Sequence, residues 1–243
     1  GLAAGAEGVG LLRTELAFLD ATAWPDEHAH EAALTPVLRH LGRRIATVRT
    51  LDFGADKTPP FLRGQAARGI GLQLGGDGAL GAQLRALLHA GKETELRIML
   101  PLVEEAGQLE TARQMLHEAH RQTGVDGSLP SLGAMIETAR AVERADEIAA
   151  AADFLSIGTN DLVQSVLGLD RLTPAATVRA AADPRVLRAI RAVTDAARRH
   201  GRSVEVCGEA AGDQRIAVLL IGLGVTELSV TPARLDEIRV SVQ

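Results

Sequence analysis

The chain alternates between short apolar runs and longer segments with helical spacing. Seven runs of strand length each end on polar or charged residues, at 9–15, 46–52, 96–103, 132–137, 154–161, 204–209 and 228–231. Helical patterns occupy segments between them, at 80–88, 105–120, 139–152, 184–200 and 213–223. The runs are continuously apolar, which is typical of strands buried on both faces. The pattern therefore predicts repeated βα units around a parallel sheet.

Two α/β architectures accommodate seven such strands: an open doubly wound sheet, or a (β/α)₈ TIM-type barrel that lacks one strand. Residues 2–8 have the character of a helix end leading into the first run, so we expect a strand upstream of Gly1 to complete the eight. The Gly-rich segment 64–81 is interpreted as a rim loop that runs into a helix. No linker divides the chain, and we expect one domain over 1–243. In a barrel, the polar ends of the runs would form the rim where chemistry takes place.

Composition and charge narrow the class of protein. With 46% apolar residues in 243, the chain is no disordered segment, and with 2% aromatic residues and no Tyr its core must be mainly aliphatic. The net charge of −5 gives no support to nucleic-acid binding. The longest apolar stretch, 216–225, is far shorter than the roughly 20 residues of a membrane helix, so no membrane insertion is expected. A single cysteine fits a reducing, cytoplasmic setting.

Two acidic side chains end neighbouring runs of the predicted barrel. Glu137 ends one run and Asp161 ends the next, 24 positions later (161 − 137), which leaves room for a strand, a helix and a strand. Two adjacent carboxylates at the rim would suit a hard cation such as Mg²⁺. The alternative is that each residue caps the helix that follows it. The occurrence of both at run ends favours the metal site.

Two arginines and the cysteine also stand near the ends of runs. Arg13 and Arg49 would be costly on buried strands unless each pairs with an acid or meets a ligand. A phosphate or carboxylate ligand is one interpretation, and an ion pair with Glu15 or Asp52 is the other. Cys207 is open to two interpretations as well, because a lone cysteine is more often a small core residue than a catalyst. The seven histidines show no metal-binding spacing at a run end.

A set of longer strings carries a family resemblance. In chain order they are GAEGVGLLRTE, VRTLDFGADKTPPFL, LRIMLPLVEE, MIETARAV, DFLSIGTNDLVQSVLGLDR, VCGEAAGD and GLGVTELSV. Together they resemble the phosphoenolpyruvate-binding, C-terminal domain of the phosphoenolpyruvate–protein phosphotransferases, Enzyme I of the bacterial sugar phosphotransferase system. The resemblance covers nearly the whole chain. The RTLDFGADK string favours Enzyme I over pyruvate phosphate dikinase and phosphoenolpyruvate synthase.

The resemblance implies a (β/α)₈ barrel and a set of roles for individual residues. By motif, the phosphate- and substrate-binding residues would be Arg13, Arg49, Arg68, Asn160 and Arg171, with Lys57 a weaker candidate. The Mg²⁺ ligands would be Glu137 and Asp161, and Cys207 would be the acid that protonates C3 of the pyruvate enolate.

Partners are implied by the same resemblance. Nothing in the chain resembles the Gly-x-Thr-Ser-His segment that holds the family's phosphoryl-accepting histidine, so that residue would belong to a separate N-terminal domain. That domain would pass the phosphoryl group to the histidine phosphocarrier protein, pyruvate would be released, and the protein would form a homodimer. Fused multiphosphoryl transfer proteins carry the same module.

The chain also departs from the family pattern. Gly71 stands where the family usually has a second arginine, the family's first barrel strand is absent before Gly1, and its C-terminal tail is cut at Gln243. Three alternatives stay open: a dikinase or synthase relative, a carbon–carbon lyase on a related pyruvate-binding barrel, and a catalytically silent dimerisation or regulatory module. The arginine set argues against the lyase, and the intact candidate residues argue against the silent module.

Overall fold

The fold is a seven-stranded sheet in a computed structural model that describes residues 1–54, 57–76, 78–169 and 178–242. Its strands follow chain order: β1 (Gly8–Arg13), β2 (Ile45–Arg49), β3 (Glu95–Leu100), β4 (Ser131–Ile136), β5 (Phe154–Gly158), β6 (Ser203–Cys207) and β7 (Glu227–Leu228). Every neighbouring pair is parallel. The sheet curls until its edge strands approach: a Cβ on Gly10 would lie 2.7 Å from the Ser229 Cβ atom. The structure therefore confirms an α/β fold with a nearly closed barrel.

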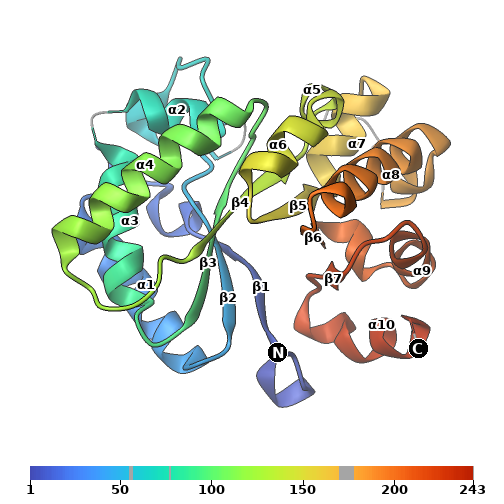
Figure 1. The fold of residues 1–243 in the computed structure, drawn as a ribbon, viewed down its shortest axis with the longest axis horizontal. Helices are drawn as coiled ribbons and strands as arrows, with labels where there is room; N and C mark the ends of the chain where they lie inside the picture. Colours follow the sequence, from blue (N-terminus) through green and yellow to red (C-terminus); the bar gives the residue numbers. More distant parts are fainter. Residues whose placement is uncertain (55–56, 77, 170–177, 243) are drawn as a thin grey trace.

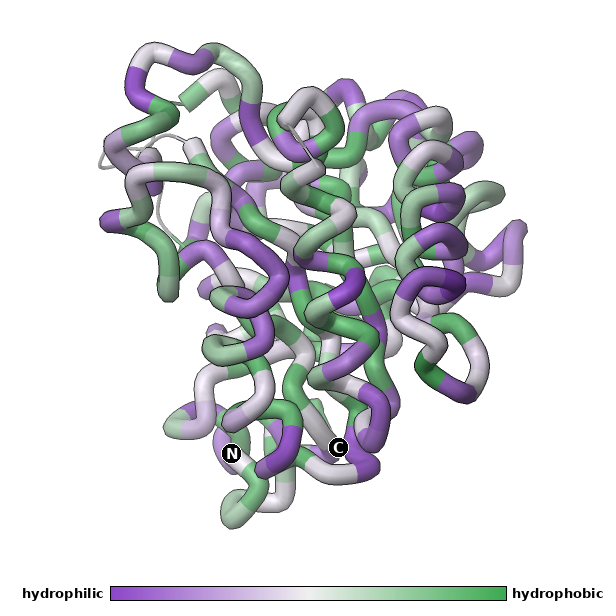
Figure 2. Tube along the Cα trace, turned by 90° about the vertical axis from the view of Figure 1, so that its left-hand side faces the viewer, coloured by the Kyte–Doolittle hydropathy of each residue, from purple (hydrophilic) through white to green (hydrophobic). Residues whose placement is uncertain are grey.

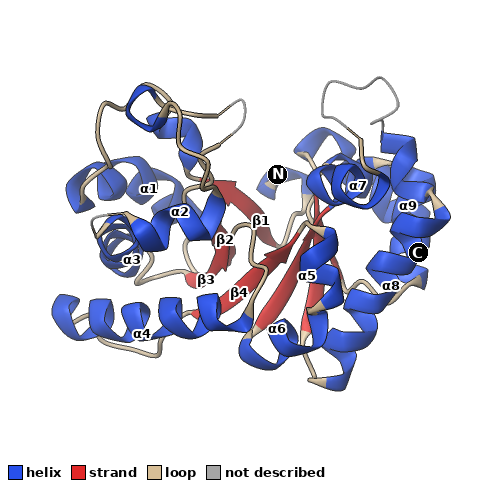
Figure 3. Ribbon diagram, turned by 90° about the horizontal axis from the view of Figure 1, so that it is seen from above, coloured by secondary structure: helices blue, strands red, loops and turns tan. Residues whose placement is uncertain are grey.

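Helices surround this sheet, as the view from above shows (Figure 3). They are α1 (Glu27–Leu41), α2 (Gly69–Gly75), α3 (Ala79–Ala90), α4 (Ala106–Thr123), α5 (Ala139–Glu143), α6 (Ala145–Ala151), α7 (Thr159–Leu167), α8 (Pro184–Arg199), α9 (Gln214–Gly222) and α10 (Leu235–Val242). Helices α1 to α4 lie on one side and α5 to α10 on the other (Figure 1). No helix in the described part of the chain has the length and apolar character that crossing a membrane requires.

The core has two layers, because side chains alternate between the faces of each strand. Outward side chains such as Val48, Ile98 and Ile157 pack against the helices in one large apolar cluster. Green hydrophobic and purple hydrophilic segments alternate along the outer helices, as an amphipathic helix requires (Figure 2). Inside the barrel, a second cluster joins four residues from four strands: Met99, Met135, Phe154 and Cys207.

Four details differ from the sequence-based expectations. Part of the segment expected to be a rim loop forms helix α2, which starts at Gly69 with φ +53°. Helix α1 was not predicted; its N-cap, Asp26, accepts a hydrogen bond of 2.8 Å from the Ala29 amide. Strand β5 ends at Gly158, so Asp161 lies in the first turn of α7 and does not end a strand. Strand β7 is Glu227–Leu228, where 228–231 was expected.

Candidate active site at the carboxyl ends of the strands

A network of ion pairs joins the ends of β1 and β2. The Glu15 Oε1 atom accepts hydrogen bonds from Arg13 Nε (3.0 Å), Arg49 Nη2 (2.7 Å) and Lys57 Nζ (3.2 Å). The Asp52 Oδ2 atom lies 2.9 Å from Arg49 Nη2 and 2.9 Å from Lys57 Nζ. Three cations thus share two carboxylates. We call Arg13, Glu15, Arg49, Asp52 and Lys57 the rim network.

The charges of the rim network stabilise one another. Burial opposes the charge of Arg49, but Asp52 and Glu15 outweigh it and raise the pKa of the guanidinium. Burial likewise opposes the charge of Asp52, yet Arg49 and Lys57 keep the pKa of that carboxyl below its usual value. The structure thus shows the ion-pair alternative for both Arg13 and Arg49. Capacity for a ligand remains, because Arg49 Nε is buried without a partner among the described residues, and the Arg13 side chain is 41% exposed.

Glu137 and Asp161 are electrostatic neighbours at the same end of the barrel. Glu137 directly follows β4, is 3% exposed, and accepts a hydrogen bond of 2.8 Å from the Leu102 amide. Burial raises the pKa of its carboxyl to about 8; repulsion from Asp52 and Asp161 adds to this effect, while Arg49 opposes it. Asp161 is half-buried in the first turn of α7. A cation between the two carboxylates would relieve their repulsion.

Cys207 is the last residue of β6 and is 3% exposed. Its Sγ atom lies 3.4 Å from Ser156 Oγ and 3.7 Å from the Ile157 carbonyl oxygen. Burial, reinforced by repulsion from Glu205, raises the pKa of the thiol to about 12. The side chain is therefore a protonated thiol at neutral pH.

Asn160 is tied to the residues that follow β6. Its Oδ1 atom accepts a hydrogen bond of 3.2 Å from the Glu209 amide. With Arg13, Asn160 and Glu209 line a groove of about 1350 Å³ that also receives residues of α9 and α10. The groove brings the two predicted substrate-binding residues Arg13 and Asn160 to one place.

Two further predicted residues have different outcomes. Arg68 is exposed at the start of α2, close enough to help lower the pKa of Asp52. A Cβ on Gly54 would lie 2.8 Å from Arg68 Nε, so the arginine runs directly alongside this glycine. Arg171 lies outside the described residues. The structure thus gathers Arg13, Arg49, Arg68, Glu137, Asn160, Asp161 and Cys207 at the carboxyl ends of the strands.

Sequence reasoning missed two groups of polar residues. Ser156 and Glu205 lie inside the barrel near Cys207; the signal was present, because Glu205 is two positions before Cys207 and therefore on the same strand face. On the outer helices, Glu27 and Glu31 of α1 approach His89 of α3. Within the described ranges, they form the only group of three acidic, histidine or cysteine side chains close enough to share a metal ion.

Solved structures with a similar fold include an aldolase of the HpcH/HpaI type from Desulfitobacterium hafniense, with a TM-score of 0.59, 18% identity, and coverage of 98% of this chain and 82% of that one. A malate synthase from Haloferax volcanii has a TM-score of 0.62 and 13% identity, and the match covers 89% of this chain and 59% of that one. At these identities, the likeness shows the barrel fold alone.

Curated relatives are more similar in sequence. A multiphosphoryl transfer protein from Xanthomonas campestris is 42% identical over 95% of this chain and 28% of its own length. Phosphoenolpyruvate-protein phosphotransferases from Haloferax volcanii and Lactococcus lactis are 39% and 37% identical, over 98% and 93% of this chain and 45% and 42% of their own. The chain thus spans less than half the length of each. The family model described as "PEP-utilising enzyme, PEP-binding domain" matches residues 1–243, so the chain belongs to the family of phosphoenolpyruvate-binding domains of PEP-utilising enzymes.

Proposed function

We propose that this chain binds phosphoenolpyruvate at the carboxyl ends of its strands and supports phosphoryl transfer to a histidine on a separate domain, with release of pyruvate. The observation that carries the proposal is the setting of Arg49. This buried guanidinium lies in the field of both the Glu137 carboxyl and the Cys207 thiol. Arg49 can bind an anion, Glu137 is a candidate metal ligand and Cys207 is a candidate proton donor. These three groups thus lie close together in a chain of the PEP-binding family.

The arginines supply the grip on the substrate. Phosphoenolpyruvate carries a phosphate and a carboxylate, and guanidinium groups bind both in bidentate fashion. Arg49 forms ion pairs with Glu15 and Asp52, and these pairs fix its orientation before the ligand binds. We assign Arg13, Arg49, Arg68 and Asn160 to substrate binding, and Arg171 joins them by its motif alone.

Glu137 and Asp161 fit the requirements of Mg²⁺. Both offer carboxylate oxygens, the donors that this hard cation prefers, and their mutual repulsion in the described structure is what a bound cation would offset. When bound, Mg²⁺ would supply charge stabilisation for the phosphate and for the enolate. The chain's own contribution is the Leu102 amide, whose hydrogen bond to Glu137 Oε1 holds one carboxylate in place.

Cys207 is the proposed acid for C3 of the enolate. When the phosphoryl group leaves, an enolate remains, and a C–H bond forms at C3 as the S–H bond of the thiol breaks. A group that keeps its proton at neutral pH suits this role, and burial gives the thiol that property. The alternative to a catalytic role is that Cys207 is a residue of the core, since Met99, Met135 and Phe154 pack around it.

The phosphoryl acceptor is proposed to be a histidine outside this chain, which then feeds the histidine phosphocarrier protein. Two of the relatives are named phosphoenolpyruvate-protein phosphotransferases, and this chain spans less than half the length of each. Incubation of the chain with labelled phosphoenolpyruvate should therefore leave it unlabelled. Stable label on any of its seven histidines would contradict this part of the proposal.

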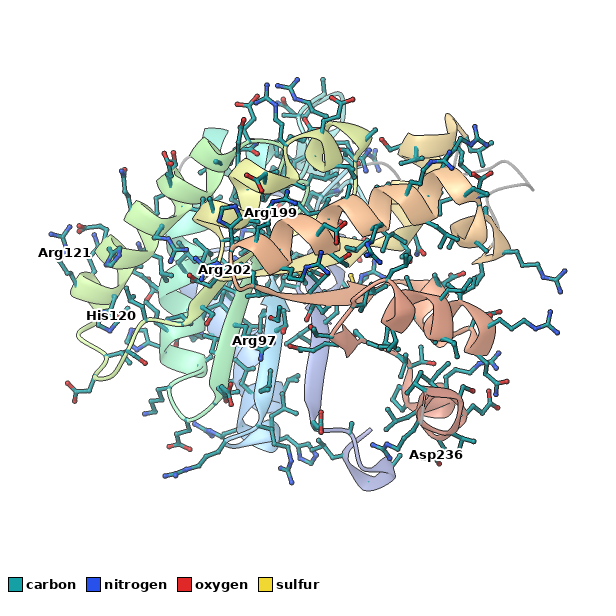
Figure 4. The ribbon with its side chains drawn as sticks, turned by 45° about the vertical axis from the view of Figure 1, so that its right-hand side comes forward. Arg97, His120, Arg121, Arg199, Arg202 and Asp236 are labelled. Carbon is teal, nitrogen blue, oxygen red and sulfur yellow. The ribbon has the colours of Figure 1, made fainter. Side chains whose placement is uncertain are left out.

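Calorimetry tests the binding of phosphoenolpyruvate. We expect binding with Mg²⁺ present and at least tenfold weaker binding with EDTA. Asp161→Asn should weaken the Mg²⁺-dependent binding, because it removes one of two anionic ligands. Asp236→Asn on α10 is the matched control, since Asp236 is exposed on an outer helix (Figure 4). Equal affinity with and without the chelator would remove the metal from the proposal, and absence of binding in both would overturn it.

A further inference from the structure

A second polar cluster lies inside the barrel, one level of side chains closer to the amino ends of the strands than Cys207. It consists of Thr47 (β2), Arg97 (β3), Ser156 (β5), Glu205 (β6) and Glu227 (β7), which we call the inner cluster. Glu205 is paired in register with Ser156 on one side and with Glu227 on the other. Arg97 Nη1 donates to both Glu227 carboxylate oxygens at 3.0 Å. In Figure 4, Arg97 lies among the strands, while Arg121 and Asp236 lie on outer helices.

Glu205 is the buried titratable group of this cluster. It is 2% exposed, and neither carboxylate oxygen has a hydrogen bond of good geometry, although the Ser156 and Thr47 hydroxyls are close enough to lower its pKa. Burial dominates and raises the pKa to about 8; Glu227 adds to the rise and Arg97 opposes it. Glu205 therefore carries its proton at neutral pH.

Ser156 stands between Glu205 and the thiol. Its hydroxyl lies 3.4 Å from Cys207 Sγ and within reach of the Glu205 carboxyl. A hydroxyl can accept one proton and donate another at the same time. The Cys207 thiol is 3% exposed, so direct proton exchange with bulk water requires the site to open, whereas the Ser156 hydroxyl is already beside it.

We propose that Glu205 and Ser156 form a proton relay that restores the Cys207 thiol after it has protonated the enolate. The inference rests on the proposed function, in which Cys207 gives its proton to C3. The Glu205 carboxyl donates its proton to Ser156 Oγ as the Ser156 hydroxyl proton passes to Cys207 Sγ. The products are the thiol, an unchanged hydroxyl and the Glu205 carboxylate.

Glu227 connects the relay to solvent. Its side chain is 37% exposed and is held by Arg97, and it neighbours Glu205 in the register of β6 and β7. Water at this end can return a proton to the Glu205 carboxylate between turnovers. Thr47 is near the same carboxyl but has no described contact with Cys207, so it lies off the path.

The test follows the methyl protons of pyruvate by NMR in D₂O, with the chain, Mg²⁺ and inorganic phosphate. We expect the wild-type chain to exchange these protons for deuterium and Cys207→Ala to lose the exchange. Glu205→Gln and Ser156→Ala should each slow it by about tenfold or more, because a positioned proton-transfer group contributes on the order of 10²–10⁴. Glu205→Asp retains a carboxyl and should be intermediate, an ordering that a purely structural role would not produce. Calorimetric binding of phosphoenolpyruvate should stay unchanged in all four variants.

Thr47→Val is the matched control, since it removes the other hydroxyl near Glu205; its exchange rate should equal that of wild type. A thermal melt of each variant verifies folding, and Ser156→Ala tests the path if Glu205→Gln does not fold. Wild-type rates in both Glu205→Gln and Ser156→Ala, with Cys207→Ala inactive, would overturn the relay and leave the proposed function standing. A wild-type chain that exchanges no protons would contradict the protonation step, and the relay with it.

Discussion

The rim network and the inner cluster are two groups of charged residues in one barrel. The first has more cations than carboxylates, and the second has more carboxyl groups than cations. The rim network has three cations for two carboxylates. The inner cluster has two carboxyl groups, Glu205 and Glu227, and one cation, Arg97. Burial is severe in both, since Glu15 is 0% exposed and Glu205 is 2% exposed.

The difference shows how charge balance decides protonation at similar burial. In the rim network, cations offset the loss of hydration, so Asp52 keeps a pKa below its usual value. In the inner cluster, Arg97 is committed to Glu227, and Glu205 holds its proton instead. The first arrangement suits the binding of an anion, and the second suits the storage of a proton.

The largest expected effect comes from breaking the rim network at its centre. Glu15→Gln leaves Arg49 and Lys57 with Asp52 as their one remaining acid among the described contacts. Removing one partner of a buried ion pair costs about 3–5 kcal/mol, so urea denaturation should show a loss of that order. Glu237→Gln, which breaks the exposed pair with Arg234, is the control and should change stability little. Equal effects in the two variants would mean that the rim network is solvated like a surface pair.

An effect of similar size, which depends on pH, is expected from Glu205→Gln. The pKa of Glu205 is raised in the folded state from 4.5 to about 8. Its favourable contribution to the free energy of unfolding is therefore fully present below pH 4.5 and is lost as pH rises to about 8. The loss is at most roughly 1.4 kcal/mol per pH unit over that range. Thermal midpoints of Glu205→Gln and wild type should match at pH 4, and the variant should be higher at pH 8.5. A difference that stays constant with pH would show that Glu205 is ionised inside the barrel.

The smallest effect on stability is expected at Arg13, the exposed cation of the rim network. Arg13→Met removes one of three hydrogen bonds to Glu15, and exposed ion pairs contribute about 0–1 kcal/mol. Affinity for phosphoenolpyruvate should nevertheless fall about tenfold or more, as expected for loss of a charged hydrogen bond of about 1.5–3 kcal/mol. A large loss of stability with unchanged affinity would place Arg13 in the scaffold and not in the binding site.

Much of the rim could be predicted from sequence, because it follows from where apolar runs stop. Cys207 ends β6 and Glu137 directly follows β4, as the runs indicated. Asp161 was predicted at a strand end and lies in α7, because the helix starts at Thr159 without an intervening loop. The sequence pattern cannot distinguish a strand end from a first helical turn here, because Thr-Asn-Asp after an apolar run is compatible with both.

Continuous apolar runs hide most of the inner cluster, although strand alternation alone places Glu205 on the same face of β6 as Cys207. Thr47, Arg97, Ser156 and Glu205 each stand between outward-facing apolar neighbours, so each was absorbed into a run. Alternation along each strand puts these side chains on one face of the sheet, but their meeting depends on the barrel's closure, which brings β2, β5 and β6 around one interior. The balance of charges there is likewise a property of strands far apart in sequence, such as Arg97 with Glu227.

The most direct test of the whole account is the pair of substitutions Cys207→Ala and Cys207→Ser, followed by two readouts. One is the exchange of pyruvate methyl protons with D₂O, and the other is the thermal midpoint. We predict that both variants bind phosphoenolpyruvate with Mg²⁺ as wild type does and lose about 10²–10⁴-fold in exchange rate. Wild-type exchange with a lowered thermal midpoint would contradict the account, because Cys207 would then be a core residue and nothing more.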